Sequence, residues 1–243
     1  MRLNRVFVDE PIRGRRTLEL GGSAANHVAR VLRLRAGDAL VVFDGRGGEY
    51  AATVAGLGKE RLTVTVGEHV AAERDPDLAI TLVQGIARGE RMDMVIQKAT
   101  ELGVARIVPV ATERSVVKTS DLRARRKREH WRAIAIAACE QCGRNRLPDV
   151  EPPTDWQAWL AGRAPAALSL LLSTRSPTRL GAVLAAVPTI ELLIGPEGGL
   201  TAAEEDAALA AGFHAVRLGP RVLRTETAAI AALAAIQQQC GDF

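Results

Sequence analysis

Aromatic residues and cysteines are scarce in this chain. Aromatic residues make up 3% of its 243 residues, so stacking on aromatic rings is not expected to dominate any contact with nucleic-acid bases. The three cysteines form an odd set without a secretory context, which argues against a disulfide framework. Cys139 and Cys142 form a CxxC pair, but the sequence has neither a second such pair nor a histidine pair at metal spacing. We therefore expect no metal site.

Long apolar runs are also missing. The alanine-rich stretch at residues 227–236 is too short to span a bilayer, and the residues after Met1 lack the pattern of a signal peptide. We therefore expect a cytoplasmic protein without membrane association. The patterns GxGxxG, GxxxxGK[ST] and GxSxG are absent too, which removes sequence support for a Rossmann dinucleotide site, a P-loop and a serine hydrolase.

The charge balance is basic, and arginine dominates it. The formal net charge is +4 and the sequence pI is about 9.3, with lysine only at positions 59, 98, 118 and 127. Arginine suits bidentate contact with phosphates and bases, although a GC-rich genome would enrich it equally. The densest cluster is RARRKREHWR at residues 123–132. A solvated helix face would explain this cluster, and so would neutralisation of RNA phosphates.

Residues 1–70 are predicted to form a small β-rich domain. Short alternating runs at residues 5–8, 17–20, 39–43, 49–54 and 62–66 are separated by glycine-rich turns such as DGRGG at 44–48, and one helical stretch covers residues 23–34. A small closed barrel with one helix is the economical arrangement. The polar, proline-containing residues 71–77 are the expected linker.

Residues 78–243 have a different pattern of predicted secondary structure, in which strands and helices alternate. Strands are expected at residues 78–83, 106–110, 168–172, 189–194 and 215–218, and helices at 90–102, 121–142, 179–186, 201–211 and 227–239. Such alternation predicts an α/β domain, with a mostly parallel sheet and helices on both of its faces.

Two Gly-Pro loops stand out within this second domain. GPEGG at residues 195–199 and GPRVL at 219–223 each lie between an expected strand and an expected helix. Because the carboxyl ends of parallel strands form the ligand-binding edge of such sheets, and because glycines allow the backbone to approach a small molecule, we predict a ligand cleft there. Either loop alone could equally be a tight turn without a ligand.

Together with other motifs, these loops resemble the bacterial 16S ribosomal RNA uracil-N3 methyltransferase family of the SPOUT superfamily. The matching stretches are ANHVARVLR at 25–33, QKATELG at 97–103, ERS at 113–115, AIAACEQCGRNR at 135–146, IGPEGG at 194–199 and LGPRVLRTETA at 218–228. The resemblance covers nearly the whole chain. It implies a C-terminal trefoil knot, an N-terminal PUA-like RNA-binding domain, a homodimer, the cofactor S-adenosylmethionine, and methylation of N3 of one uridine in the 16S RNA of the small subunit.

The same resemblance assigns roles to individual residues. Arg224 is the candidate for holding negative charge on a uracil carbonyl oxygen as the N3 proton leaves. Glu226 is a candidate general base, but the start of the last helix favours its ionised form and lowers its basicity, so an orienting role is favoured. The base is left open, and water could serve. The residues expected to contact the cofactor are Leu172, Ser173, Ile194, Gly195, Glu197, Gly198, Gly199, Leu218, Gly219, Val222, Leu223 and Thr227.

Contact with RNA is expected from basic residues in both domains. Two other functions stay open: a SPOUT methyltransferase that modifies a ribose 2′-hydroxyl or another base, and a ribosome-assembly factor that binds RNA without catalysis. The intact loop motifs argue against the second. The candidate RNA-binding residues are Arg2, Arg5, Arg33, Arg114, Lys118, Arg125, Arg126, Arg144 and Arg146.

Overall fold

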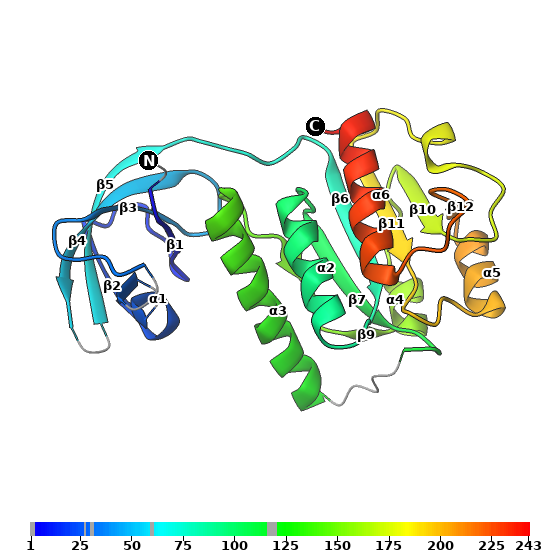
Figure 1. Ribbon diagram of the computed structural model, residues 1–243, viewed down its shortest axis with the longest axis horizontal. Coiled ribbons are helices and arrows are strands. Elements are labelled where there is room, and N and C mark those ends of the chain that lie inside the picture. Colours follow the sequence, from blue (N-terminus) through cyan, green and yellow to red (C-terminus); the bar gives the residue numbers. More distant parts are fainter. Residues whose placement is uncertain (1–2, 27, 30–31, 59–60, 116–120) are drawn as a thin grey trace. The chain divides into compact units, whose positions relative to one another are not determined.

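The structure, a computed structural model, describes residues 3–26, 28–29, 32–58, 61–115 and 121–243 (Figure 1). The chain divides into two compact units. Unit 1 comprises Met1–Asp75 and Ile136–Leu147, and unit 2 comprises Pro76–Ala135 and Pro148–Phe243. Residues 136–147, expected from the sequence within the second domain, thus belong to unit 1.

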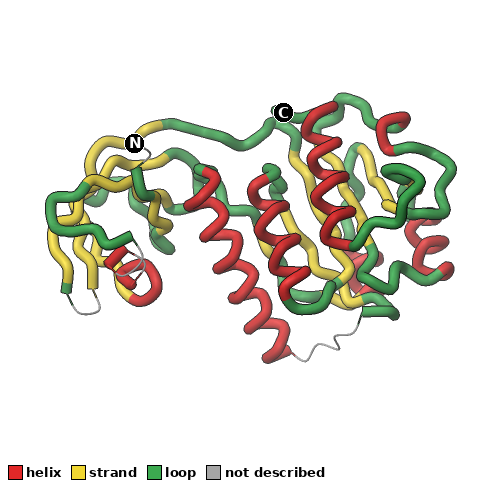
Figure 2. The backbone as a smooth tube through the Cα atoms, in the orientation of Figure 1, coloured by secondary structure: helices red, strands yellow, loops and turns green. Residues whose placement is uncertain are grey.

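Unit 1 contains a curled five-stranded sheet in the order β1-β3-β4-β5-β2 (Figure 2). β1 pairs with β3 in parallel, and the other pairs are antiparallel. The alternation seen in the sequence becomes an inner face, on which side chains such as Val42 and Val64 are fully buried. The elements are β1 (Arg5–Phe7), β2 (Thr17–Gly21), α1 (Gly22–Asn26), β3 (Ala39–Phe43), β4 (Glu49–Leu57) and β5 (Arg61–Val70).

The helix in unit 1 is shorter than expected. The sequence predicts it over residues 23–34, but α1 ends at Asn26, and of the described residues between there and 34 only 28–29 are helical, in a π-helical conformation. Arg33 has a φ of 55°, which a right-handed helix does not accommodate.

A buried polar network explains why residues 136–147 belong to unit 1. The Arg5 guanidinium donates to the carbonyl oxygen of Arg144 at 3.1 Å and to Oδ1 of Asn145 at 2.5 Å, and it pairs with Glu49. The Arg144 guanidinium pairs in turn with Asp75. Because burying an unpaired charge is costly, these contacts specify how the two segments meet.

Unit 2 contains the predicted parallel sheet, in the order β12-β10-β11-β6-β7-β8, with β9 also paired to β7. Every pairing in this sheet is parallel. The trefoil knot stays a prediction. The strands are β6 (Ala79–Gly85), β7 (Arg106–Ala111), β8 (Asp149–Val150), β9 (Thr154–Asp155), β10 (Leu168–Leu172), β11 (Thr189–Ile194) and β12 (His214–Val216).

Helices cover both faces of this sheet, as predicted. α2 and α6 lie side by side on one face, and α4 and α5 pack on the other through a core that includes Trp156, Trp159 and Ala208 (Figure 1). None of the described helices has the length and hydropathy of a membrane-spanning segment. The helices are α2 (Glu90–Glu101), α3 (Asp121–Cys142, shared by the two units), α4 (Trp156–Gly162), α5 (Ala202–Ala210) and α6 (Thr225–Cys240).

One predicted helix of unit 2 is wrong. The sequence predicts it over residues 179–186, but the chain forms only a 3-10 turn, η2 (Leu180–Ala182). The backbone here pairs with the chain beyond β12 instead: the amide of Leu180 donates to the carbonyl of Arg217, and the amide of Arg217 donates to that of Thr178.

Candidate functional site

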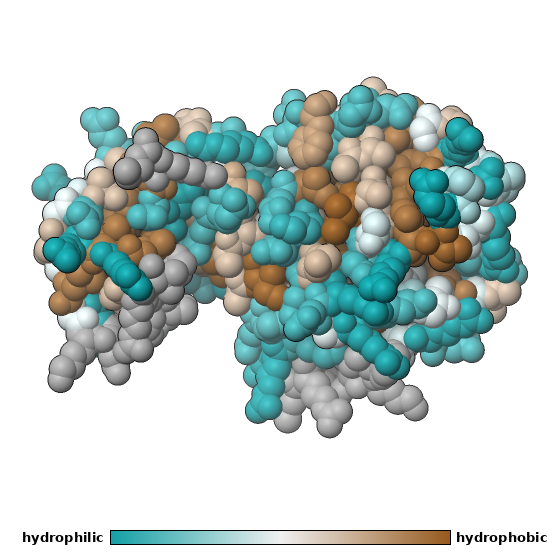
Figure 3. Space-filling view, in the orientation of Figure 1, coloured by the Kyte–Doolittle hydropathy of each residue, from teal (hydrophilic) through white to brown (hydrophobic). Residues whose placement is uncertain are grey.

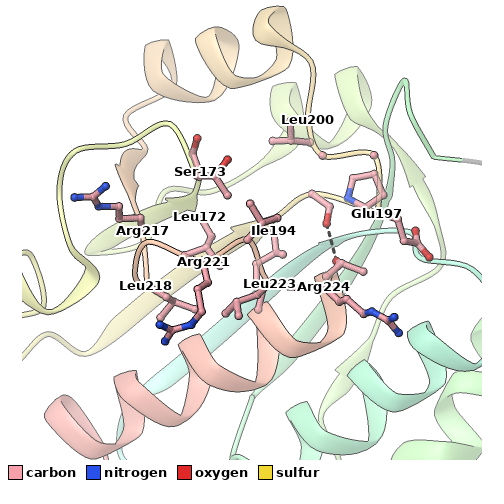
Figure 4. A pocket seen from close by; sticks show the side chains of 18 of the residues that line it. Leu172, Ser173, Ile194, Glu197, Leu200, Arg217, Leu218, Arg221, Leu223 and Arg224 are labelled. Carbon is pink, nitrogen blue, oxygen red and sulfur yellow. Dashed lines mark hydrogen bonds between the residues drawn. The ribbon is translucent and has the colours of Figure 1, made fainter.

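A cavity of about 560 Å³ opens in unit 2 where β10 and β11 end (Figure 4). Three loops form its wall: residues 172–174, 194–200 and 217–225. They are far apart in the sequence and meet because parallel strands end at the same edge of a sheet. Thr227 does not line the cavity; it is exposed on the first turn of α6. The other eleven predicted cofactor residues do line it: Leu172, Ser173, Ile194, Gly195, Glu197, Gly198, Gly199, Leu218, Gly219, Val222 and Leu223.

The loop after β11 is packed too closely for side chains at certain positions. A Cβ at Gly195 would lie 2.9 Å from the amide nitrogen of Leu200, and one at Gly85, the last residue of β6, would lie 2.5 Å from Cδ of Pro196. Gly199 has a φ of 68°, a conformation that favours glycine. Glycines therefore let this loop fold back on itself and against β6.

A buried hydrogen-bond network joins this loop to the start of α6. The Thr225 hydroxyl donates to the carbonyl oxygen of Gly195 at 2.7 Å and accepts from Nε2 of Gln84 at 2.9 Å. Nε2 of Gln84 also donates to the carbonyl oxygen of Gly85 at 2.9 Å. Gln84 is fully buried. Sequence reasoning missed Gln84, although a glutamine within an otherwise apolar strand was the available signal.

The helix after the first loop begins with the predicted capping box. The Thr201 side chain accepts from the amide of Glu204 at 3.2 Å, and the Glu204 carboxylate accepts from the amide of Thr201 at 2.8 Å. The same carboxylate accepts from the amide of Glu113 at 2.8 Å. Glu204 therefore also ties the loop after β7 to α5.

The charged residues that line the cavity are two glutamates and four arginines: Glu197, Glu205, Arg91, Arg217, Arg221 and Arg224. Glu197 accepts from the Arg88 amide at 2.9 Å and from the Arg91 guanidinium at 3.1 Å. Burial acts to raise the pKa of Glu197, but these hydrogen bonds outweigh it and hold the pKa below its usual range. Arg221 and Arg224, which also line the cavity, are exposed. Neither has a side-chain partner within the described part of the chain.

The two predicted catalytic residues are placed differently. Arg224 lines the cavity (Figure 4). It is also the N-cap residue of α6, but its side chain does not hydrogen-bond to the backbone amides at the start of that helix. Glu226 is 7% exposed and does not line the cavity. Among the residues that the structure describes, its Oε2 atom has no hydrogen-bond partner.

The predicted RNA-binding residues fall into three groups. Arg33, Arg125 and Arg126 are exposed. Arg114 donates to the carbonyl oxygen of Gly198 at 2.9 Å, and Arg146 lies 3.5 Å from Glu73. Arg5 and Arg144 were also expected to contact RNA, but they are 7% and 4% exposed, and their burial does not fit contact with phosphates. Arg2 and Lys118 lie outside the described residues.

The CxxC pair does not form a disulfide: Cys139, Cys142 and Cys240 are all free thiols. Within the described ranges, no cluster of three or more His, Cys, Asp or Glu side chains is arranged to hold a metal ion. Cys139 is buried against Phe7 and Phe43.

The parallel sheet with its three-loop cavity defines an α/β domain of the kind that binds a small molecule, carried together with a β-rich unit. Residues 74–237 match the family described as an RNA methyltransferase domain, and residues 20–67 match one described as an RNA methyltransferase PUA domain. The chain belongs to this RNA methyltransferase family.

Individual relatives are similar to this chain over most of its length. Ribosomal RNA small subunit methyltransferase E of Bacillus subtilis (strain 168) is 31% identical over 92% of this chain and 90% of the relative. A crystal structure of the protein of the same name from Neisseria gonorrhoeae, bound to S-adenosyl methionine, is 38% identical with a TM-score of 0.91 and covers 99% of both chains. A putative methyltransferase from Legionella pneumophila, in complex with the same cofactor, is 38% identical with a TM-score of 0.96 and covers 100% of both chains.

Proposed function

We propose that this protein uses S-adenosylmethionine to methylate N3 of one uridine in the 16S RNA of the small ribosomal subunit. The observation that carries the proposal is the cavity in unit 2, which is lined by eleven of the twelve residues expected from the sequence. The two related structures that hold S-adenosylmethionine support the choice of cofactor. The names of the curated relatives support ribosomal RNA of the small subunit as the substrate. The choice of uridine N3 as the methylated atom is supported by the motif resemblance.

The residues around the cavity fit such a cofactor. Leu172, Ile194, Leu218 and Leu223 supply apolar contacts suited to an adenine ring. The glycine-containing loops present backbone amides and carbonyls, which can hydrogen-bond to the polar groups of the cofactor because no side chains stand in the way. A Cβ at Gly219 would meet no protein atom within 4 Å, so the space beside it is open to a ligand. When bound, the cofactor supplies a methyl group on a sulfonium sulfur.

The chain's own part in the reaction is positioning and charge stabilisation. As the methyl–sulfur bond breaks, its electron pair stays on sulfur, while the N3–methyl bond forms and the N3 proton leaves. Arg224 holds the negative charge that develops on a uracil carbonyl oxygen, because the residue lines the cavity and its exposed guanidinium has no partner in the described part of the chain. The proton goes to water, since Glu226 is buried and does not line the cavity.

RNA approaches the cavity through basic side chains. Arg221 at the cavity and Arg125 and Arg126 on α3 are exposed, so these three contact phosphates, and binding is expected to depend steeply on salt. Shape and phosphate contacts account for most of this binding.

The proposal also includes a homodimer, a trefoil knot and a cytoplasmic location. The first two come from the resemblance, and the third comes from the lack of long apolar runs and of a signal-peptide pattern in the sequence. The surface around α6 supports an interface there: Figure 3 shows hydrophobic side chains on this part of unit 2, bordered by hydrophilic ones.

Primer extension tests the reaction. Purified protein is incubated with S-adenosylmethionine and unmodified small ribosomal subunits, and reverse transcription is run across the 16S RNA. A methyl group on N3 blocks the Watson–Crick edge, so we expect one new stop in the decoding region, with mass spectrometry naming the atom. Methyl incorporation without a stop would favour a ribose 2′-hydroxyl instead. No incorporation would favour an assembly factor that binds RNA without catalysis.

A substitution tests the role of Arg224. Arg224→Ala should abolish methyl transfer while leaving RNA binding near the wild-type level, because it removes a group that acts on the transition state. Arg179→Ala is the matched control, since Arg179 is an exposed arginine of unit 2 that does not line the cavity. Retained turnover in the Arg224→Ala protein would refute the role.

A further inference from the structure

Unit 1 contains a second cavity, of about 1010 Å³, which the proposed reaction does not use. Its walls come from the loop at residues 11–16, the loop at 44–47 and the end of β5. Two hydrogen bonds hold these segments together: the amide of Ile12 donates to Asp44 at 3.2 Å, and the amide of Val66 donates to the carbonyl oxygen of Arg16 at 2.9 Å. We call this cavity the basic groove.

Positive charge predominates in the basic groove. Arg13, Arg15, Arg16 and Arg46 all line it and are exposed. Arg15 pairs with Glu10 at 2.9 Å, whereas Arg13, Arg16 and Arg46 have no side-chain partner in the described part of unit 1. Several unpaired arginines around one cavity favour an anionic ligand, and their planar guanidinium groups match phosphate.

One carboxylate, that of Asp44, lines the groove beside the four arginines. One Asp44 oxygen accepts from the amide of Ile12 and the other from the amide of Arg46. Both oxygens are therefore engaged by the backbone of the loops that form the groove and by none of its arginine side chains, and the lining keeps an excess of positive charge.

An aromatic pair lies among these arginines. Tyr50, the single tyrosine of the chain, faces His69 across β4 and β5, with ring centroids 4.8 Å apart. A Cβ at Gly48 would lie 2.1 Å from Nε2 of His69, so the glycine makes room for the imidazole. The Tyr50 hydroxyl has no hydrogen-bond partner among the described residues. Tyr50 is partly buried against the core of unit 1, whereas His69 is exposed. The imidazole ring and the tyrosine hydroxyl are therefore the groups of this pair that suit an unpaired nucleobase.

We propose that the basic groove binds a single-stranded segment of RNA, with phosphates on Arg13, Arg16 and Arg46 and a base against Tyr50 and His69. The choice of RNA rests on the proposed function. Phosphates alone would explain the arginines but not the aromatic pair, and an acidic peptide would leave the ring faces unused. A duplex is disfavoured because its bases are already stacked on each other. The groove is distinct from Arg5 and Arg144, which are buried.

Charge reversal tests the phosphate contacts in the full-length protein. The probe is a fluorescein-labelled RNA of about ten nucleotides without self-complementarity, followed by anisotropy. The Arg13→Glu/Arg16→Glu protein should bind at least about tenfold more weakly, and the slope of log affinity against log salt should fall by about 1 to 1.5. The matched control is Arg35→Glu/Arg61→Glu, which makes the same charge change at exposed arginines of unit 1 outside the groove. Equal losses in both proteins would overturn the proposal.

A second substitution tests stacking. His69→Ala should weaken binding by about 5- to 100-fold without changing the salt slope, and Glu68→Ala, an exposed neighbour outside the groove, should not weaken it. Wild-type affinity in the His69→Ala protein would exclude base stacking. If labelled polyglutamate binds the wild-type protein more tightly than the RNA does and loses this affinity in the Arg13→Glu/Arg16→Glu protein, the groove is an acidic-peptide site and the proposal is wrong.

Cross-linking locates the RNA without any substitution. A probe carrying 4-thiouridine should attach to peptides from residues 11–16, 44–50 or 66–69; attachment confined to residues 121–135 would overturn the proposal. These outcomes are separate from the proposed reaction. If the primer-extension stop is found but the groove variants bind RNA like the wild type, only the proposal for the basic groove is wrong. If the groove binds RNA but no methyl group is incorporated, only the proposed methylation reaction is wrong.

Discussion

Replacing Thr225 by valine should loosen the loop that forms the cavity wall in unit 2. The substitution keeps the side chain's shape and its branched Cβ, but it removes the hydroxyl that donates to Gly195 and accepts from Gln84. The Gly195 carbonyl is then left with the Gln84 amide at 3.4 Å, which is a weak contact. The start of α6 and the loop after β11 lose their direct connection.

The magnitude follows from the burial of the partners. Thr225 is 6% exposed and Gln84 is fully buried, so leaving their polar atoms unpaired should cost about 1 to 3 kcal/mol of the free energy of unfolding. If the Gly195 loop shifts as a result, S-adenosylmethionine affinity should fall by about tenfold for each 1.4 kcal/mol of binding energy lost. Thr225→Ser keeps the hydroxyl and is the control; it should lose about 1 kcal/mol of stability through the missing methyl group but retain cofactor affinity.

Tryptophan fluorescence makes this measurement specific to unit 2. All three tryptophans, at positions 131, 156 and 159, lie in unit 2, so urea unfolding followed by their emission reports on that unit. Isothermal titration with S-adenosylmethionine gives the affinity. A Thr225→Val protein as stable as wild type, with the same cofactor affinity, would refute the reasoning. Gln84→Met in a double-mutant cycle with Thr225→Val should show a coupling of about 0.5 kcal/mol or more.

Two further predictions concern titratable groups in unit 1. Burial acts to raise the pKa of Glu49, but hydrogen bonds from Arg74 and Arg5 outweigh it and hold the pKa below its usual range. The ionised Glu49 carboxylate therefore adds its full contribution to the free energy of unfolding above the ordinary glutamate pKa of about 4.3, and this contribution is lost as the pH falls through the lower folded-state pKa. Calorimetry at several pH values should show that Glu49→Gln destabilises the protein at neutral pH. The difference in stability between the variant and the wild type should narrow in acid. Burial raises the pKa of the Cys139 thiol to about 12, so roughly one molecule in ten thousand carries the thiolate at pH 8. Labelling of Cys139 by iodoacetamide should require unfolding, and rapid labelling in the native protein, located by mass spectrometry, would contradict this.

The sequence predicts those features that depend on neighbouring residues. The apolar run at residues 189–194 and the Thr201–Glu204 capping box were recognisable because strand burial and helix capping repeat at short spacing. The Gly-Pro loops were recognisable for the same reason, and a parallel sheet brings such loops to one edge. Helix 179–186 was predicted wrongly because Leu180 and Arg217, which are distant in the sequence, pair through their backbones.

The sequence by itself thus determined most of the alternating elements of unit 2, the position of its cavity and, through the motifs, the family. It did not indicate β8, β9 and α4. Only the tertiary structure decided the roles of single polar side chains. Gln84 and Thr225 are 141 positions apart, and Arg5 and Asn145 are 140 apart. Nothing local indicates that Arg5 is buried against partners while Arg13 is exposed in a groove. An exposed arginine keeps its hydration and carries little free-energy cost, whereas a buried arginine must be fully paired. The role of each arginine is therefore set by the partners that the fold places next to it.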